Sequence, residues 1–459
     1  MLSKSDFRSY LECPCLLWLE KVRPDLLPPD FNDDLQAIFE EGRKVDLESR
    51  KLYPGGFEVP GFVREGWKHT QTALKAGHDT LFQPTAISGE IHARADILTR
   101  SGQTWDLREV KSSTQVKDDH ILDLAFQRLC FDGAKVPIGR TFLIHVNNRY
   151  VRHGDIEPKK LLLAEDVTSA VNTAVPEMRG DIKEALKVIG WGRKPDERNV
   201  DACTDPADCE YLGYYLKLLP ARLRAKLEAM RYEEPLPNPP VIDVDKAGLR
   251  RLLGTLRYPL QFLDYETFFP AIPMFDGYRP YQHVTFQYSL HTQDAPGAKL
   301  RHAEYLEDQA VDPTVRLAEH LRGNVASGGT FIAWNATFEK GRNQEMGERA
   351  PKFAKFFRSV NERMFDPMYI FKKKGGYYRH SGFQGSASLK KVLPVIVPSL
   401  SYQDLTIQEG GTASASWPIL TDPKTPIVKR NRLRKAMLDY CALDTRAMPA
   451  ILNHLKSVL

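Results

Sequence analysis

The sequence predicts an α/β protein of two domains, with strands and helices in both. Three observations support this prediction. The chain has 459 residues, more than a single domain of about 100 to 200 residues usually contains. Its hydrophobic content of 42% is enough to form packed cores. Short apolar runs alternate with stretches of helical periodicity on both sides of a proline-rich segment.

The N-terminal half begins with helices. A serine cap at Ser3 or Ser5, followed by acidic Asp6, starts the first, and residues 35–52 repeat apolar positions at helical spacing. The period then changes to that of strands. The elements expected next are a hairpin of residues 92–99 and 104–111, a helix over 118–130 and a strand over 140–146.

The proline-rich segment 233–240 cannot continue a helix or join a central strand, so we expect a linker there. The expected domains are residues 1–231 and 257–459, joined by 232–256. Beyond the linker, the sequence predicts a mixed α/β sheet with helices 245–256 and 432–454 and strands 261–266, 284–290 and 330–334.

Composition excludes several classes of protein. No early apolar run approaches the length of about 20 residues that a membrane span needs, so we expect a cytoplasmic protein with no membrane partner. Six cysteines are too few for a disulfide framework and leave buried thiols or a metal site. A net charge of +5 permits a polyanionic partner where the charge is clustered.

Two carboxylates and a lysine share one face of the predicted hairpin. With the loop at residues 101–102, Asp96 lies opposite Leu107, one same-face step from Glu109, and Lys111 continues that face. Acids that hold a divalent cation, with an ammonium near the attacking water, suit phosphodiester hydrolysis. The alternative is an exposed hairpin with alternating charges.

The wider order of motifs comprises Gly89–Glu90, Arg94–Leu98, Glu109–Ser113 and the helical Gln127. It resembles the RecB-like branch of the PD-(D/E)XK nucleases over roughly residues 1 to 220. The resemblance implies catalytic roles for Asp96, Glu109 and Lys111, metal binding by the two acids, and support from Gln127. Relatives often carry a histidine on the second helix, where this chain has the run from Gly42 to Asp46.

A second acidic pattern lies in the C-terminal half. Asp264 and Glu266 alternate on a predicted strand, so both carboxylates point to one face, where a bound Mg²⁺ or Mn²⁺ would offset their repulsion. Solvated acids at an ordinary strand end are the alternative. Downstream, Glu339 lies in a helix that follows a strand, and one helical turn separates Tyr440 from Asp444.

These features resemble the DnaQ-like exonucleases of the RNase H fold. The resemblance implies that Asp264, Glu266, Glu339 and Asp444 bind two metal ions and that Tyr440 helps to orient the attacking water. Most relatives have aspartate at the position of Glu339, and a core-anchoring role for Tyr440 remains the alternative. With the motifs Gly385–Pro394 and Ile407–Ala413, the whole chain resembles an uncharacterised bacterial family that fuses the two nuclease-like halves and whose C-terminal part is a domain of unknown function.

Basic and aromatic residues are interleaved between Ala350 and Lys391. This composition suits a surface that follows a phosphate backbone and stacks bases, or else a solvated surface with aromatics in the core. The aromatic residues are Phe356, Phe357, Tyr369, Phe371, Tyr377, Tyr378 and Phe383, and the expected nucleic-acid-binding residues are Lys372, Lys373, Lys374, Arg379, Lys390 and Lys391.

Three cysteines resemble the ligands of RecB-like nucleases that hold an iron–sulfur cluster. Cys13, Cys203 and Cys209 match, but Tyr215 stands where the fourth cysteine is expected, and Cys15 is the nearby substitute. We therefore expect no stable [4Fe–4S] cluster or at most a labile one; packing alone, or a zinc ion with three thiolates and a further ligand, would hold this region.

The sequence thus predicts a two-domain nuclease that hydrolyses DNA with Mg²⁺ or Mn²⁺. Two other readings stay open: a nucleic-acid-binding protein in which one or both centres are inactive, and a ribonuclease.

Overall fold

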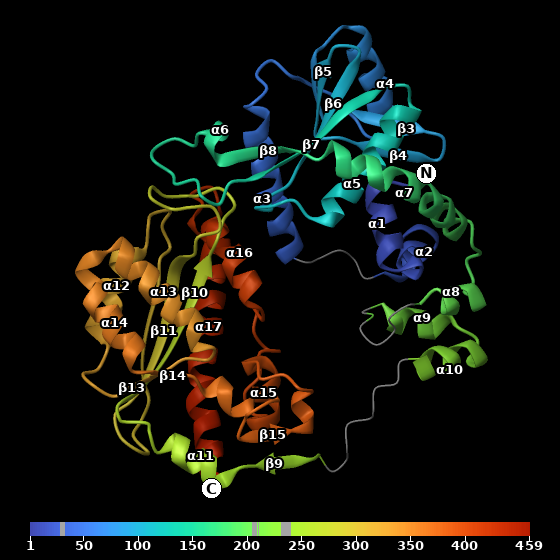
Figure 1. Ribbon diagram of the computed structural model, residues 1–459. Coiled ribbons are helices and arrows are strands. Elements are labelled where there is room, and N and C mark those ends of the chain that lie inside the picture. Colours follow the sequence, from blue (N-terminus) through green and yellow to red (C-terminus); the bar gives the residue numbers. More distant parts are fainter. Residues whose placement is uncertain (28–32, 204–208, 210, 231–239) are drawn as a thin grey trace. The chain divides into compact units, whose positions relative to one another are not determined.

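The computed structural model describes residues 1–27, 33–203, 209, 211–230 and 240–459 and divides the chain into two compact units (Figure 1). The first unit comprises residues 1–32, 38–234 and 271–280, and the second comprises 33–37, 235–270 and 281–459. The predicted linker, 233–240, lies outside the described residues except for Pro240. Both units contain mixed sheets, as the predicted α/β class requires. Among the described helices, none is long and apolar enough to cross a membrane.

The first unit contains a six-stranded sheet in the order β1-β2-β5-β6-β7-β8. The β1–β2 and β6–β7 pairs are parallel, and the other neighbours are antiparallel. Strands β3 and β4 form a separate antiparallel pair. The bounds are β1 Phe57–Glu58, β2 Thr80–Phe82, β3 Thr85–Ser88, β4 Ile91–Arg94, β5 Ile97–Ser101, β6 Thr104–Val110, β7 Ile138–Val146 and β8 Leu162–Asp166.

Helix α5 is at the centre of this unit and packs against β3, β4 and β7. Helices α1 and α7 pack beside α5, and α2 packs on both of them. Its middle is buried because apolar residues occur on most of its faces. The helices are α1 Lys4–Glu12, α2 Pro14–Val22, η1 Pro24–Leu26, α3 Asp33–Arg50, α4 Val63–Lys75, α5 Asp118–Gly133, α6 Pro158–Leu161, α7 Thr168–Ile189, α8 Glu197–Asp201, α9 Leu212–Leu218 and α10 Ala221–Met230.

The start of the chain folds as its capping residues predict. Ser3 Oγ accepts a hydrogen bond from the Asp6 amide, and the Asp6 carboxylate accepts one from the Ser3 amide. This first helix ends at Glu12, because Cys13 is extended and Pro14, which has no N–H group, begins a second helix.

The two-residue loop of the hairpin was predicted one residue too early in the chain, so the predicted register of the two strands was wrong. Ser101 pairs with Thr104, so the two loop residues are Gly102, with φ +62°, and Gln103. The pair Ile97–Arg108 puts Asp96 next to Glu109, two residues beyond the partner expected for it. Moving a partner by two residues preserves the face of the sheet, so the acids still converge. The first predicted strand is also two strands, β4 and β5.

The second unit contains a five-stranded sheet in the order β12-β11-β10-β13-β14. Strands β12, β11 and β10 are antiparallel neighbours, whereas β10, β13 and β14 are parallel. Strands β9 and β15 form a second, antiparallel sheet. The bounds are β9 Ile242–Val244, β10 Leu260–Phe268, β11 Val284–Gln293, β12 Arg301–Leu306, β13 Thr330–Ile332, β14 Met364–Phe365 and β15 Tyr378–His380.

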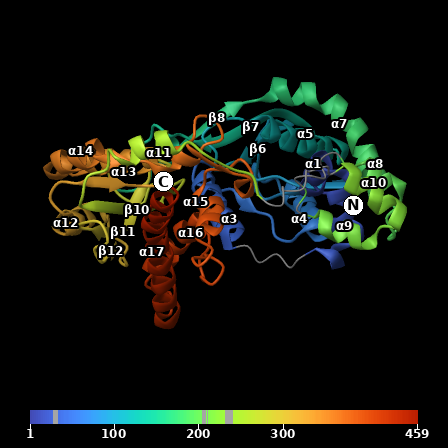
Figure 2. The same ribbon diagram turned by 90° about the horizontal axis from the view of Figure 1, so that it is seen from below.

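Helices cover both faces of the five-stranded sheet. Helix α12 packs on β11 and β12, with α13 and α14 beyond it, while α16 and α17 pack on β10 and β11 from the other side (Figures 1 and 2). The helices are α11 Lys246–Leu253, α12 Thr314–Asn324, α13 Ala336–Arg349, η2 Pro351–Phe353, α14 Ala354–Glu362, η3 Pro367–Phe371, η4 Ser381–Phe383, α15 Leu389–Ile396, α16 Gly410–Thr421 and α17 Ile427–Ser457.

The central strand β10 divides its side chains between the two layers. Leu263 and Tyr265 join the apolar core with α12 and α13, so Asp264 and Glu266 point to the opposite face, toward α16 and α17. Because both faces are covered, nearly the whole strand is buried. The sheet therefore carries two carboxylates into the interior of the unit.

Candidate active sites

The acids of β10 lie beside a break in strand pairing. Asp264 is opposite Ser289 and Glu266 is opposite Gln287, and the register with β11 shifts immediately after Glu266. Such irregularities redirect side chains and are common next to active sites. Here the shift coincides with the start of a cavity of about 430 Å³ that Asp264, Glu266 and Thr267 line.

Glu339 enters the same cavity from the first turn of α13. The chain turns sharply between β13 and α13 at Asn335, whose φ of +64° is left-handed, a conformation that asparagine tolerates better than most residues. The Asp366 carboxylate accepts hydrogen bonds from the amides of Asn335 and Ala336 at 3.1 and 3.2 Å. Asp366 therefore holds the start of the helix that positions Glu339.

Helix α17 supplies Tyr440 and Asp444, which line the cavity from one face of the helix as their spacing predicts. The Tyr402 hydroxyl donates a hydrogen bond to Asp444 Oδ1, and the Tyr402 and Tyr440 rings lie 6.0 Å apart. The structure thus brings together all five predicted residues of the C-terminal site and adds Tyr402.

The charges of Lys390 and Arg342 compensate the four carboxylates only in part. Burial and the charge of Asp444 raise the pKa of Asp264 well above its usual range, burial and the neighbouring acids do the same for Glu266 and Glu339, and burial raises the pKa of Asp444 to about 7. Glu339 is only 2% exposed, and its Oε2 accepts no hydrogen bond within the part of the chain described. Bound cations would relieve this repulsion.

Positive groups approach the cavity from one side. Lys390 lines it, donates a hydrogen bond to Glu409, and its ammonium is 5.6 Å from the centre of the Tyr440 ring. The first residues of α15 and α16, including Leu389 and Gly410, also line it. Helix N-termini carry partial positive charge and free N–H groups, so an anion can be held next to the acids.

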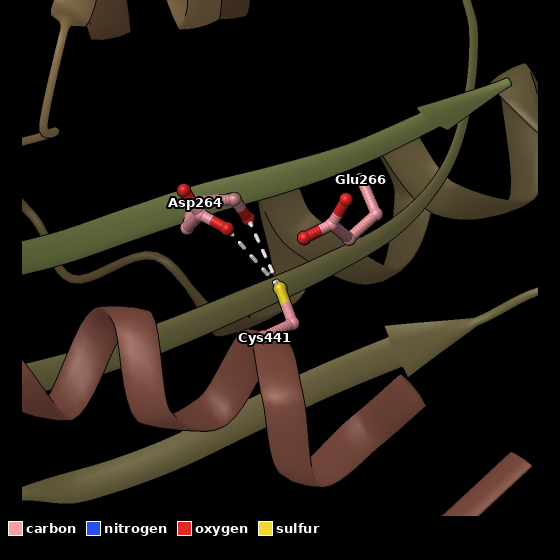
Figure 3. Close-up of side chains that lie close together, drawn as sticks. All are labelled: Asp264, Glu266 and Cys441. Atoms are coloured by element: carbon pink, nitrogen blue, oxygen red, sulfur yellow. Dashed lines mark hydrogen bonds between the residues drawn. The ribbon is translucent and has the colours of Figure 1, made fainter. Parts of the chain in front are cut away.

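Cys441 lies under the acids of β10 (Figure 3). Its thiol donates a hydrogen bond to Asp264 Oδ2 over 3.4 Å. Ligand atoms of Asp264, Glu266 and Cys441 all lie within 4.8 Å of one another, and among the described residues this is the only group of three or more His, Cys, Asp and Glu side chains that meets that limit.

The predicted residues of the first unit also meet. Glu109 Oε2 accepts a hydrogen bond of 2.5 Å from Gln127, and its Oε1 lies 2.8 Å from the Lys111 ammonium. Two further residues join them: Lys4 Nζ is 2.6 Å from the same Oε1, and buried Asp123 is 2.5 Å from Lys111. Nothing in the sequence pattern marked Lys4 or Asp123.

Asp96 completes this group. Its Oδ2 accepts a 2.7 Å hydrogen bond from the Val110 amide, and its Oδ1 accepts one of 3.2 Å from Gln83. Burial and the charge of Glu109 raise the pKa of Asp96 to about 7, and the charge of Asp46 adds to that shift. Asp46 itself pairs with Arg50 at 2.7 Å.

The two centres differ in charge balance. Burial alone would raise the pKa of Glu109, but the ammonium groups of Lys4 and Lys111 outweigh it and hold that pKa far below its usual range. Burial would lower the pKa of Lys111, but Glu109 and Asp123 raise it. In the N-terminal centre two lysines contact the glutamate directly, whereas in the C-terminal centre Lys390 acts on the acids only by its charge.

The predicted basic surface separates into two places. Lys372 and Lys374 line a second cavity, of about 470 Å³, where the Lys372 ammonium is 3.8 Å from the centre of the Tyr369 ring, while Lys390 lines the acidic cavity. The others are at the surface: Lys373 is exposed, Arg379 pairs with Asp243 at 3.2 Å, and Lys391 donates to Gln384.

Four of the seven interleaved aromatics lie in the core, as the second of the two alternatives for this segment expects. Phe357, Phe371, Tyr378 and Phe383 are buried, because their spacing places them in the core, and the last three contact one another. Tyr369, in contrast, is 52% exposed.

The N-terminal cysteines lie at the start of α2. A hydrogen bond from the Cys15 thiol lowers the pKa of Cys13 to about 6, and Cys15 Sγ also contacts the Asn199 carbonyl oxygen at 2.7 Å. Cys203 is buried and Cys209 half-buried. The segment between them, 204–208, and the side chain of Tyr215 lie outside the described residues.

Comparisons with known proteins cover part of the chain. A family model described as a domain of unknown function (DUF2779) matches residues 261–388. Over 210 residues the chain is 26% identical to "Uncharacterized protein MG366 homolog" of Mycoplasma pneumoniae. The aligned region covers 41% of this chain and 31% of that protein. It is 23% identical over 216 residues to "Uncharacterized protein MG366" of Mycoplasma genitalium, covering 43% and 32% respectively. The chain thus spans about a third of the length of these relatives, whose names carry no activity.

Proposed function

We propose that the chain is a metal-dependent nuclease and that the cavity of the second unit is its main phosphodiesterase centre. The observation that carries the proposal is the convergence of Asp264, Glu266, Glu339 and Asp444 from three elements on one cavity, without matching positive charge. Oxygen donors of this kind suit Mg²⁺ or Mn²⁺. The central position of β10 in a mixed sheet supports a DnaQ-like, RNase H-type fold.

Each group around the cavity has a role in this chemistry. The metal ions would supply Lewis acidity to activate water and to neutralise the leaving oxygen. Tyr440 stays a neutral phenol, because burial and Asp444 raise its pKa, so its hydroxyl can orient the water. Lys390 and the N-termini of α15 and α16 would bind the phosphate. Tyr402 fixes the orientation of Asp444.

The first unit supports a second candidate centre of the PD-(D/E)XK type. Asp96, Glu109, Lys111 and Gln127 gather as that family requires. The ion pairs of Lys4 and Lys111 with Glu109 favour a centre that binds metal weakly, or one that only binds nucleic acid, over an efficient nuclease. The DNA-hydrolysing activity is therefore assigned first to the second unit.

The test uses the full chain with end-labelled single- and double-stranded DNA and RNA, with Mg²⁺ or Mn²⁺. Asp264→Asn and Asp444→Asn should abolish cleavage. Asp439→Asn is the matched control, since Asp439 lies on the same helix but pairs with Lys435 at the surface. Cleavage that persists in both site variants and disappears in Asp96→Asn would assign the activity to the first unit. Preference for RNA would make the protein a ribonuclease, and binding without cleavage a nucleic-acid-binding protein.

A further inference from the structure

The thiol of Cys441 is placed as a ligand would be. It is fully buried on α17, and its Sγ lies 3.4 Å from Asp264 Oδ2. In a tetrahedral zinc site, with zinc–sulfur and zinc–oxygen distances of about 2.3 and 2.1 Å, neighbouring sulfur and oxygen ligands are about 3.6 Å apart. The observed separation matches that spacing. Glu266 adds a third ligand atom within 4.8 Å of the other two (Figure 3).

The combination of donors differs from the oxygen-only set that Mg²⁺ prefers. Thiolate selects borderline or soft cations such as Zn²⁺ and Co²⁺, and carboxylates accept the same ions. Asp264 and Glu266 are on a strand and Cys441 is on a helix packed against it, so the three positions are fixed by buried elements. No backbone rearrangement is needed to bring them together.

An independent observation shows that the same cavity has an unmet need for a positive partner. Glu339 Oε2 is buried, accepts no hydrogen bond in the described structure, and belongs to a side chain that lines the cavity with Asp264 and Glu266. The negative charge of Asp264 acts directly on Glu339. A cation bound between Asp264, Glu266 and Cys441 would compensate Glu339 as well.

We infer that Asp264, Glu266 and Cys441 form a mixed thiolate and carboxylate site for a borderline-soft divalent cation such as Zn²⁺, and that this cation excludes the oxygen-ligated Mg²⁺ or Mn²⁺ of the nuclease centre. Binding releases the thiol proton to solvent, because cysteine binds metal as the thiolate. The inference shares two carboxylates with the proposed function, but the site binds metal whether or not the cavity cleaves nucleic acid.

Titration of the full chain with Co²⁺, without substrate, tests the site. A cobalt–thiolate bond produces a near-ultraviolet charge-transfer band that oxygen ligands do not. In the wild type, we expect the intensity of this band to saturate at one equivalent of Co²⁺. The band should be absent in Cys441→Ala and weakened in Asp264→Asn, which keeps all six cysteines. It should persist in Cys13→Ser, the control for the other thiols.

Zinc should displace the cobalt, and Cys441→Ala should weaken zinc binding more than about tenfold while changing Mn²⁺ binding much less. If Cys441→Ala does not fold, Asp264→Asn tests the site with every thiol present. No cobalt band in the wild type, or a band that survives in Cys441→Ala, would overturn the inference; the thiol would then serve only as a hydrogen-bond donor to Asp264. An intact cobalt band in one sample, with no cleavage by a separate metal-free sample supplied with Mg²⁺ or Mn²⁺ alone, would overturn the proposed function alone.

Discussion

The ammonium of Lys4 lies 2.6 Å from Oε1 of Glu109, the same oxygen that Lys111 approaches to 2.8 Å. The first unit therefore places a cation supplied by its own N-terminal helix against a carboxylate that should bind metal. In the second unit, Lys390 lines the cavity and lowers the pKa of Glu266 and Asp444 by its charge, but its ammonium donates its hydrogen bond to Glu409. The difference in charge balance predicts a difference in metal affinity.

Replacing Lys4 with methionine should strengthen metal binding at the N-terminal centre by about tenfold, or about 1.4 kcal/mol, because one competing positive charge is removed. The measurement is Mn²⁺ binding to the full chain by titration calorimetry. Every protein that is measured also carries Asp264→Asn and Asp444→Asn, so that the second unit does not contribute to metal binding. Lys21→Met serves as the control, since Lys21 pairs with Asp6 at 2.9 Å. An unchanged affinity in Lys4→Met would mean that Lys4 does not compete with the metal.

Metal-free stability should fall as the pH rises from about 4 to about 7. Because the pKa of Asp444 is raised to about 7, the folded chain holds a proton there that the unfolded chain has already lost. The free energy of unfolding then decreases with pH, by at most about 1.4 kcal/mol per pH unit for each such proton, up to about pH 7. Thermal melts between about pH 4 and pH 8 measure this slope and the plateau above it.

The comparison that isolates the effect is wild type against Asp444→Asn. Burial lowers the pKa values of His283 and His291 to about 4, which gives the opposite slope, but both proteins share that contribution. The wild type should lose more stability with rising pH than the variant, and Mn²⁺ should reduce the difference by stabilising the ionised acids. Parallel curves for the two proteins would contradict the raised pKa.

Removing the hydroxyl of Tyr402 should weaken the C-terminal centre without altering its ligands. Tyr402→Phe loses the hydrogen bond that holds Asp444, and such losses around metal ligands reduce affinity or activity by about 10- to 100-fold. Cleavage rates at several Mn²⁺ concentrations should show the defect largely as a higher metal requirement. Tyr369→Phe, at an exposed position, should behave as wild type. Equal metal requirements for both variants would make Tyr402 a packing residue.

Local spacing predicted two pairs of the C-terminal site, whereas Glu339 and the grouping of all five residues came from the resemblance to DnaQ-like exonucleases. Alternation put Asp264 and Glu266 on one face of β10, and one helical turn aligned Tyr440 with Asp444. Tyr402 has no such pattern, because it reaches Asp444 from a loop 42 residues away. Cys441 did carry a signal: it is three residues before Asp444 on α17, a spacing that puts both on one side of a helix.

The N-terminal site shows where spacing stops being informative. The hairpin placed Asp96, Glu109 and Lys111 on one face even with its loop misplaced by one residue, because the resulting register change is two residues. Lys4 meets Glu109 across 105 positions of sequence, and that contact depends on how α1 packs against α5. The short strands β12 and β14 were also missed, since brief edge strands have weak patterns.

The loop of Lys372, Lys373 and Lys374 should make phosphate contacts that do not depend on sequence. Lys372 and Lys374 line a cavity beside exposed Tyr369, and Lys373 is exposed, so all three ammonium groups are available to a backbone. Each lost contact reduces the slope of log binding constant against log salt by about 0.7 to 0.9, so the triple alanine variant should lose about two units.

The measurement is binding of a fluorescent single-stranded oligonucleotide at several salt concentrations, with metal omitted to prevent cleavage. The control combines Lys352→Ala with Lys435→Ala, because these lysines already pair with Glu319 and Asp439. Their removal should leave the slope unchanged, since paired lysines release few counterions on binding. The same slope for the triple variant and the control would show that these three lysines do not contact the phosphate backbone. Lys390 and the helix N-termini at the acidic cavity would then be the next candidates for phosphate contacts in the second unit.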